Sequence, residues 1–248
     1  MTVKDKILLG RTYLGIELGS TRIKAVLIDD SFSVIASGSK QWENRFENGC
    51  WTYSLDDIHG GIQACYKDLA ENVKAQYGIY PETYGAMGIS AMMHGYMAFD
   101  KNDKLLVPFR TWRNTMTAQA AGELTKLLGF NIPQRWSIAH LYQAVLNKEA
   151  HVPYIAYINT LAGYVHKRLT DRFEVGVGEA SGIFPVEGIG YKKEYLEPTE
   201  KSLAEKGFDH KLKDILPAVR NAGEKGAVLT EEGAKFLDPE GRLKACLL

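Results

Sequence analysis

The chain has 248 residues, and its 30 Lys and Arg balance its 30 Asp and Glu, so the formal net charge is zero. This balance gives no basic excess for binding nucleic acid or an anionic membrane surface. The longest apolar runs fall well short of a membrane span, and the charged N-terminus lacks the apolar core of a signal peptide. Three widely spaced cysteines, Cys50, Cys65 and Cys246, favour a reducing, cytoplasmic setting over a disulfide framework or a zinc site.

Three short apolar runs separated by turns open the chain. The first covers 14–18 and ends at Gly19-Ser20-Thr21, the second covers 23–28, and the third covers 32–37 after a turn at 29–31. Short turns between runs of this kind predict an antiparallel meander of three strands.

A long helix is predicted next. Ser54 with Asp57 three residues later is typical of a helix start, apolar residues follow at helical spacing, and Gly78 ends the segment. The remaining pattern predicts strands at 86–90 and 156–159, a hairpin of 96–99 with 105–107, helices at 117–128, 137–146 and 161–169, a turn at 179–182, and helical pieces near 200–206 and 231–236. A meander followed by alternating helices and strands predicts an α/β domain with a mixed sheet flanked by helices.

The first candidate for chemistry is the turn Gly19-Ser20-Thr21. Small residues between two strands leave backbone N–H groups exposed, and such groups can bind phosphate. Glu17, just before the turn, could hold a hydrated Mg²⁺, and Lys24 could add positive charge. The same pattern also fits an ordinary hairpin turn, and it is not a Walker A loop, because GxxxxGK[ST] does not occur here.

Two further candidates lie in the middle of the chain. His94 stands between Met93 and Gly95 at a predicted strand end, where a polar group can enter a cleft. Trp112, Arg113 and Asn114 are adjacent, and an aromatic face beside hydrogen-bonding groups is suited to holding a sugar. Alone, the histidine also fits a satisfied buried residue, and the second segment also fits a surface loop anchored by its tryptophan.

The order of these segments along the chain resembles the FGGY carbohydrate kinases. The resemblance rests on the strand–GST–strand start, "GIS…MHG…D…P…W" in the middle, "EASG" later, and "LPAVRNAGEKGAVLTEEGA" near the end. The "MHG" form is similar to that of pentulose kinases such as xylulokinase. The resemblance implies a ribonuclease-H-like fold of the actin, hexokinase and Hsp70 superfamily, in which two domains enclose nucleotide and sugar.

The resemblance also implies roles for residues that match the family pattern. The Gly19-Ser20-Thr21 turn would bind the ATP phosphates and lie near Mg²⁺, and Glu17 stands in place of the usual aspartate beside the metal. Met93, His94 and the segment at Trp112 would bind a ketopentose or related sugar. Three positions depart from the family: Asn114 and Met116 replace the usual Asp and Arg, and Met92 replaces Gln. These departures leave the exact sugar undecided.

Members of the family are much longer than this chain, and their general base lies in a Gly-Asp motif at the start of the second half. This sequence contains no Gly-Asp dipeptide. The resemblance therefore implies that 1–248 is an N-terminal sugar-binding domain without the C-terminal nucleotide-binding domain, with no catalytic base and little kinase activity by itself. An exposed cleft face would favour self-association, as in a homodimer. A sugar-binding or regulatory half-kinase, and a non-sugar ATPase of the actin and Hsp70 type, stay open as alternatives.

Overall fold

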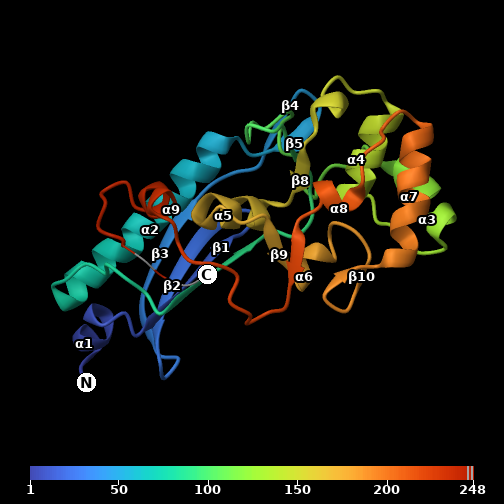
Figure 1. Ribbon diagram of the computed structural model, residues 1–248. Coiled ribbons are helices and arrows are strands. Elements are labelled where there is room, and N and C mark those ends of the chain that lie inside the picture. Colours follow the sequence, from blue (N-terminus) through green and yellow to red (C-terminus); the bar gives the residue numbers. More distant parts are fainter. Residues whose placement is uncertain (245, 247) are drawn as a thin grey trace.

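A four-stranded mixed sheet organises the computed structural model, which describes residues 1–244, 246 and 248 (Figure 1). The strand order is β3-β2-β1-β6, with bounds Val34–Gln41, Arg22–Asp29, Thr12–Leu18 and Ala86–Ala91. The first three strands form the predicted antiparallel meander, and β6 pairs with β1 in parallel. The predicted start of the third strand at position 32 is wrong, because Phe32 lies in the turn with a left-handed φ of 60°.

Three helices cover one face of this sheet. Along β1, buried and exposed residues alternate strictly, so one face is apolar and the other faces outward. The apolar face packs against α2 (Leu55–Tyr77), α5 (Leu161–Thr170) and α9 (Glu231–Leu237), which lie together on one side of the sheet in Figure 1. The predicted start of α2 is confirmed, because Ser54 and Asp57 form a capping box.

A second apolar core lies beyond the sheet. It is built from helices and one short strand pair: α3 (Ala118–Leu128), α4 (Ser137–Leu146), α7 (Lys193–Glu205), α8 (Leu212–Ile215), β7 (Met97–Phe99) and β8 (Tyr157–Asn159). The predicted hairpin of 96–99 with 105–107 is confirmed in part: Leu105 bridges Phe99 and the amide of Leu106 donates to the carbonyl oxygen of Ala98, while β7 takes β8 as its strand partner. Pro108, which has no backbone N–H, lies between this contact and the antiparallel bridge that pairs Tyr96 with Arg110.

The remaining elements are short. They are α1 (Val3–Leu8), β4 (Arg45–Glu47), β5 (Cys50–Thr52), the 3₁₀ turn η1 (Val152–Tyr154), β9 (Glu174–Gly176), α6 (Val177–Ala180), β10 (Val186–Glu187), β11 (Gly190–Tyr191) and β12 (Ala218–Arg220). The predicted turn at 179–182 is therefore partly wrong, since α6 runs through its first residues. A parallel pair, β9 and β12, stays separate from the main sheet. Among the described helices, none combines the length and apolar character needed to span a membrane.

The backbones of β3 and α2 touch at Gly38. A Cβ placed there would lie 2.4 Å from the amide nitrogen of Leu69 and 2.5 Å from the carbonyl oxygen of Cys65. Both atoms belong to a helix backbone that cannot yield locally. We expect Gly38→Ala to lower the free energy of unfolding by about 3 kcal/mol or more, measured by urea denaturation.

Gly60→Ala is the matched control, because it lies on the exposed side of α2 and its added carbon meets no atom within 4 Å. It should leave the stability unchanged or raise it by up to about 1 kcal/mol through helix propensity. Equal losses in the two variants would contradict the proposed backbone contact.

Candidate functional site

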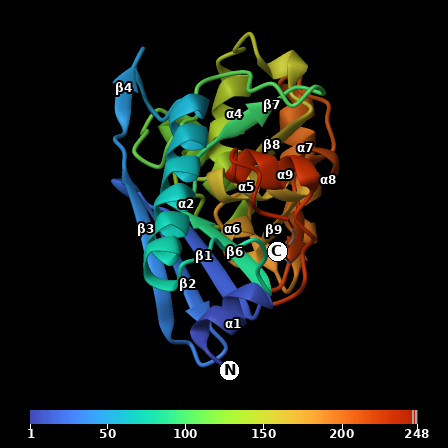
Figure 2. The same ribbon diagram turned by 90° about the vertical axis from the view of Figure 1, so that its left-hand side faces the viewer.

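The parallel pairing of β1 with β6 brings the predicted phosphate turn and the predicted sugar residues to one edge of the sheet. The carboxyl ends of parallel strands meet at the same edge. Gly19-Ser20-Thr21 follows β1, and Met93 and His94 lie two and three residues after the end of β6. Figure 2 shows the two strands next to one another. Segments about seventy residues apart in the sequence are thus neighbours in space.

Two aromatic side chains hydrogen-bond to the backbone carbonyl oxygens of this turn. The indole N–H of Trp42 donates to the backbone carbonyl oxygen of Gly19 over 2.7 Å. The hydroxyl of Tyr53 donates to the backbone carbonyl oxygen of Ser20 over 2.5 Å. The two rings stack with centroids 4.2 Å apart. Among the hydrogen bonds of the described residues, none has the amide of Ser20 or Thr21 as donor. With its carbonyl groups engaged and these amides free, the turn suits an anion.

A row of polar side chains crosses the open face of the sheet beside this turn. Glu17 is paired across the ladders with Lys24 on one side and with Ser90 on the other. The carboxylate of Glu17 lies 3.8 Å from the Lys24 ammonium, and both side chains are more than half exposed. The described residues hold no cluster of three or more metal-ligating side chains. A single exposed carboxylate fits Mg²⁺ that takes most of its ligands from water and phosphate.

His94 is held in an unusual backbone conformation against Gly182. Its φ is 70°, and a Cβ built on Gly182 would lie only 2.6 Å from Nδ1 of the His94 ring. The glycine of "EASG" therefore makes room for the histidine of "MHG". Burial, and then the neighbouring positive charge of Arg135, lower the pKa of His94. Its Nδ1 is buried against Gly182, whose backbone acts on the ring in the direction that raises the pKa, so the ring is a neutral group packed on that glycine.

The backbone ties the Trp112 segment to the chain that follows His94. Tyr96 and Arg110 exchange two backbone hydrogen bonds, of 2.9 and 3.0 Å. A Cβ at Gly95 would meet the carbonyl oxygen of Arg110 at 2.7 Å, so only glycine permits this approach. The indole of Trp112 is 43% exposed at the tip of the segment, where it is available to a ligand.

Arg113 and Asn114 fasten this segment to Trp51. The Asn114 amide oxygen accepts from the backbone N–H of Trp51, and its NH₂ donates to the carbonyl oxygens of Trp51 and Thr111. The guanidinium of Arg113 lies over the Trp51 ring, 3.7 Å from its centroid. Both side chains thus fix the loop that presents Trp112.

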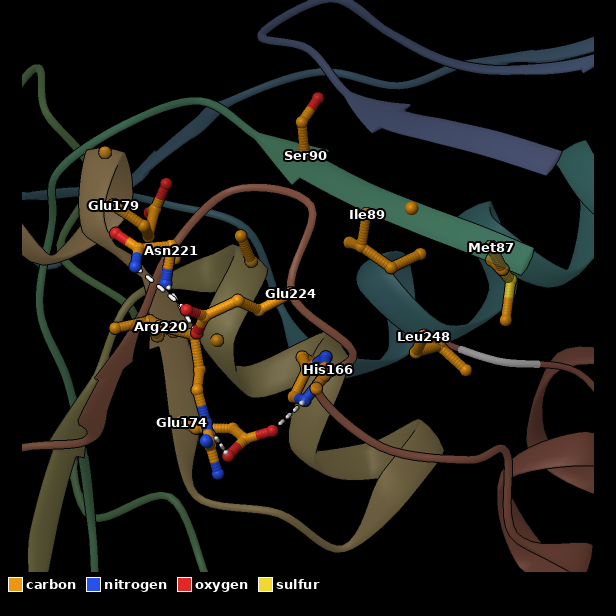
Figure 3. Close-up of a pocket in the computed structure, with 17 residues that line it drawn as sticks. Met87, Ile89, Ser90, His166, Glu174, Glu179, Arg220, Asn221, Glu224 and Leu248 are labelled. Carbon is orange, nitrogen blue, oxygen red and sulfur yellow. Dashed lines mark hydrogen bonds and ion pairs between the residues drawn. The ribbon is translucent and has the colours of Figure 1, made fainter. Parts of the chain in front are cut away.

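Sequence reasoning missed a groove between β6 and β9, with a volume of about 360 Å³ (Figure 3). Met87 and Leu248 lie toward one end and Glu179 and Asn221 toward the other. Burial raises the pKa of Glu179 to about 7, although a hydrogen bond with Thr160 acts in the opposite direction. The available signal was the two acids, Glu174 and Glu179, in the Gly- and Val-rich run from 174 to 182.

Comparisons with known proteins agree on one family. The sequence model of one protein family, the N-terminal domain of the FGGY family of carbohydrate kinases, matches residues 12–238. The xylulose kinase of Lactococcus lactis subsp. lactis (strain IL1403) is 23% identical over 124 residues, which are 47% of this chain and 23% of that protein. The gluconate kinase structure from Lactobacillus acidophilus has a TM-score of 0.75 at 19% identity, covering 96% of this chain and 47% of that one.

The xylulose kinase structure from Rhodospirillum rubrum has a TM-score of 0.73 at 17% identity, covering 96% of this chain and 48% of its own. These likenesses confirm the predicted actin-like α/β fold. The chain spans less than half the length of each of these three relatives.

Stability should depend on pH through Glu179. Its pKa is about 7 in the folded chain and 4.5 in the reference state, so the unfolded carboxyl ionises first as the pH rises. The folded state therefore loses stability between about pH 4.5 and 7, and none of this penalty is present below that window. Because Glu179→Gln cannot ionise, we expect its advantage over wild type to grow by about 3 kcal/mol across the window, measured by urea denaturation.

The control for this prediction is Glu187→Gln, which removes an exposed carboxylate from β10. It should follow the wild-type pH profile. A Glu179→Gln profile parallel to wild type would show that this carboxyl is as well solvated in the folded chain as in the unfolded one.

Proposed function

We propose that this chain, which belongs to the FGGY family of carbohydrate kinases, is the N-terminal, sugar-binding half of an ATP-dependent sugar kinase. In that reaction a sugar hydroxyl attacks the γ-phosphorus of ATP, ADP leaves, and the hydroxyl proton passes to a base. The observation that carries the proposal is the shared edge of β1 and β6. It brings the Gly19-Ser20-Thr21 turn to the same edge of the sheet as His94, and the segment that carries the exposed Trp112 is bonded to the chain at Tyr96.

On the phosphate side, the amides of Ser20 and Thr21 would donate to phosphate oxygens, with Lys24 adding positive charge. Gly19 permits the turn, because a Cβ there would approach the carbonyl oxygen of Arg22 to 3.0 Å. Glu17 would hold Mg²⁺ through its waters, and the ion, when bound with ATP, offsets charge on the phosphates. The turn is already ordered by its aromatic supports, so binding an anion requires little rearrangement.

On the sugar side, Met93, His94 and Trp112 would contact the substrate. A neutral imidazole can accept a hydrogen bond from a sugar hydroxyl, and an indole face packs on the C–H groups of a sugar ring or chain. Arg113 and Asn114 keep the loop in place. The "MHG" pattern and the similarity to two xylulose kinases support a ketopentose as the substrate class.

The general base would come from the second half of the kinase, in the Gly-Asp motif that the family resemblance implies. That half would also supply most of the nucleotide pocket. A general base contributes typically about 10²–10⁴ in rate, and closure of two domains excludes water from the phosphoryl group. The chain alone would therefore bind sugar without phosphorylating it efficiently.

We expect D-xylulose to change the tryptophan fluorescence of the isolated chain through Trp112. Trp112→Phe should remove most of the change. His94→Asn should raise the Kd by about tenfold, because one hydrogen bond to the ligand is lost, whereas asparagine still tolerates the left-handed backbone at this position. His210→Asn, at an exposed position far along the chain, is the matched control and should bind as wild type.

If ketopentoses, gluconate and glycerol all leave the fluorescence unchanged, the sugar-binding assignment is wrong. Binding that is equally weakened by the His94 and His210 variants would show that the effect is not local to the proposed site.

We expect the isolated chain to release ADP from Mg-ATP with D-xylulose at a rate at least about 10²-fold below that of a complete xylulose kinase. A coupled ADP-release assay measures this, with the Rhodospirillum rubrum enzyme as the positive control. Turnover by the isolated chain that matches the complete enzyme would overturn the assignment of the base to the second half. ATP turnover that ignores sugar would favour a different ATPase function.

A further inference from the structure

A cavity with a volume of about 780 Å³ lies between the Trp112 segment, α3 and the loop 131–135 that leads into α4. Two positive charges line it, Lys126 on α3 and Arg135 on the loop, and none of the described residues that line it is Asp or Glu. The chain as a whole has no net charge. The positive charge of this cavity is therefore a local feature, and it favours an anion.

Neither positive charge is neutralised by a carboxylate of the chain. Among the ion pairs of residues 1–244, 246 and 248, none includes Lys126 or Arg135. Glu123, the acid of α3, instead lies 4.0 Å from the Lys206 ammonium and accepts a hydrogen bond from the Tyr142 hydroxyl. The side chains of Lys126 and Arg135 are exposed, so both cations are available to a ligand that enters the cavity.

The loop that carries Arg135 is fastened to its surroundings by hydrogen bonds. The amide of Ile132 donates to the Thr125 hydroxyl over 3.0 Å, and the Thr117 hydroxyl donates to the backbone carbonyl oxygen of Gln134 over 2.5 Å. A side chain on a fixed backbone leaves less conformational freedom to be lost on binding than one on a mobile loop. The loop therefore presents Arg135 to the cavity from a fixed position.

Arg135 also lies next to the residues predicted to hold the sugar. Its backbone carbonyl oxygen accepts a hydrogen bond of 3.1 Å from the amide of Gly95, the residue after His94. The positive charge of Arg135 contributes to the lowered pKa of His94. Trp112, whose side chain is exposed, lines the same cavity as Arg135. The cavity thus adjoins both proposed sugar contacts, Trp112 and His94.

We propose that this cavity is an oxyanion subsite of the sugar site, so that the chain prefers a sugar that carries a carboxylate or a phosphate over a neutral sugar of the same length. The proposal rests on the proposed function, since it takes Trp112 and His94 as the contacts of the sugar itself. The planar guanidinium of Arg135 can donate two parallel hydrogen bonds to either oxyanion, and Lys126 adds a point charge. A ketopentose uses the sugar contacts without the two cations and therefore binds more weakly.

D-gluconate and D-glucitol are a matched pair of ligands, because they differ only in a carboxylate against a hydroxymethyl group at one end. We expect isothermal titration calorimetry on the full chain to give a Kd for D-gluconate at least about tenfold below that for D-glucitol. Added salt should weaken the binding of D-gluconate and leave that of D-glucitol almost unchanged, because it screens the exposed cations. The same comparison of D-xylulose 5-phosphate with D-xylulose tests a phosphate in place of a carboxylate.

Arg135→Gln should bring the two Kd values of each ligand pair to within about twofold of one another, whereas Arg135→Lys, which keeps the charge but not the planar fork, should retain part of the preference. Arg11→Gln is the matched control, because Arg11 is exposed and lies at the opposite end of β1 from the Gly19 turn. It should keep the full preference. Thermal unfolding checks that each variant folds, and Lys126→Gln, which should reduce the preference by about threefold, provides a second variant of the cavity.

A preference in one ligand pair alone supports the subsite and identifies its oxyanion. Equal Kd values within both pairs would overturn the subsite and leave the sugar-binding assignment in place. A preference that survives Arg135→Gln unchanged would also overturn it, because the anion would then be bound elsewhere. If none of the four ligands binds, the proposed function is wrong and the subsite with it.

Discussion

The parallel ladder between β1 and β6 is the interaction on which the rest of the structure depends. A parallel pair requires a long connection, and here the connection contains β2, β3 and the 23-residue helix α2. The ladder places the ends of two strands side by side, and each end carries a polar segment instead of continuing as a strand. Any shift of register by one residue would turn Glu17 and Ser90 into the core and bring apolar residues to the open face.

The second constraint is the close packing of helices on one face of the sheet. Gly38 allows α2 to rest on the backbone of β3, and α5 and α9 join the same apolar core. Because all three helices lie on this face, the other face keeps exposed side chains such as Tyr13 and Val26 beside the polar row. The asymmetry leaves the polar row of Lys24, Glu17 and Ser90 accessible, which a sheet covered on both faces would not do.

Local patterns in the sequence predicted the parts of the fold that depend on near neighbours. The meander, the capped start of α2 and the helices at 118–128 and 137–146 all have short-range signals, namely turns, caps and helical spacing. The pairing of β7 with β8 was missed because it joins segments about sixty residues apart, and strands of three residues carry too little pattern.

In the candidate site, too, the sequence predicted features formed by near neighbours and missed those formed by residues far apart in the chain. The Gly19-Ser20-Thr21 turn was visible as small residues between strands, but the support from Trp42 and Tyr53 was not, because neither lies near it in sequence. Asn114 was predicted to hydrogen-bond a sugar, and in the structure its amide group bonds the backbone of Trp51. A sequence shows that a polar group is present; only packing shows which partner uses it.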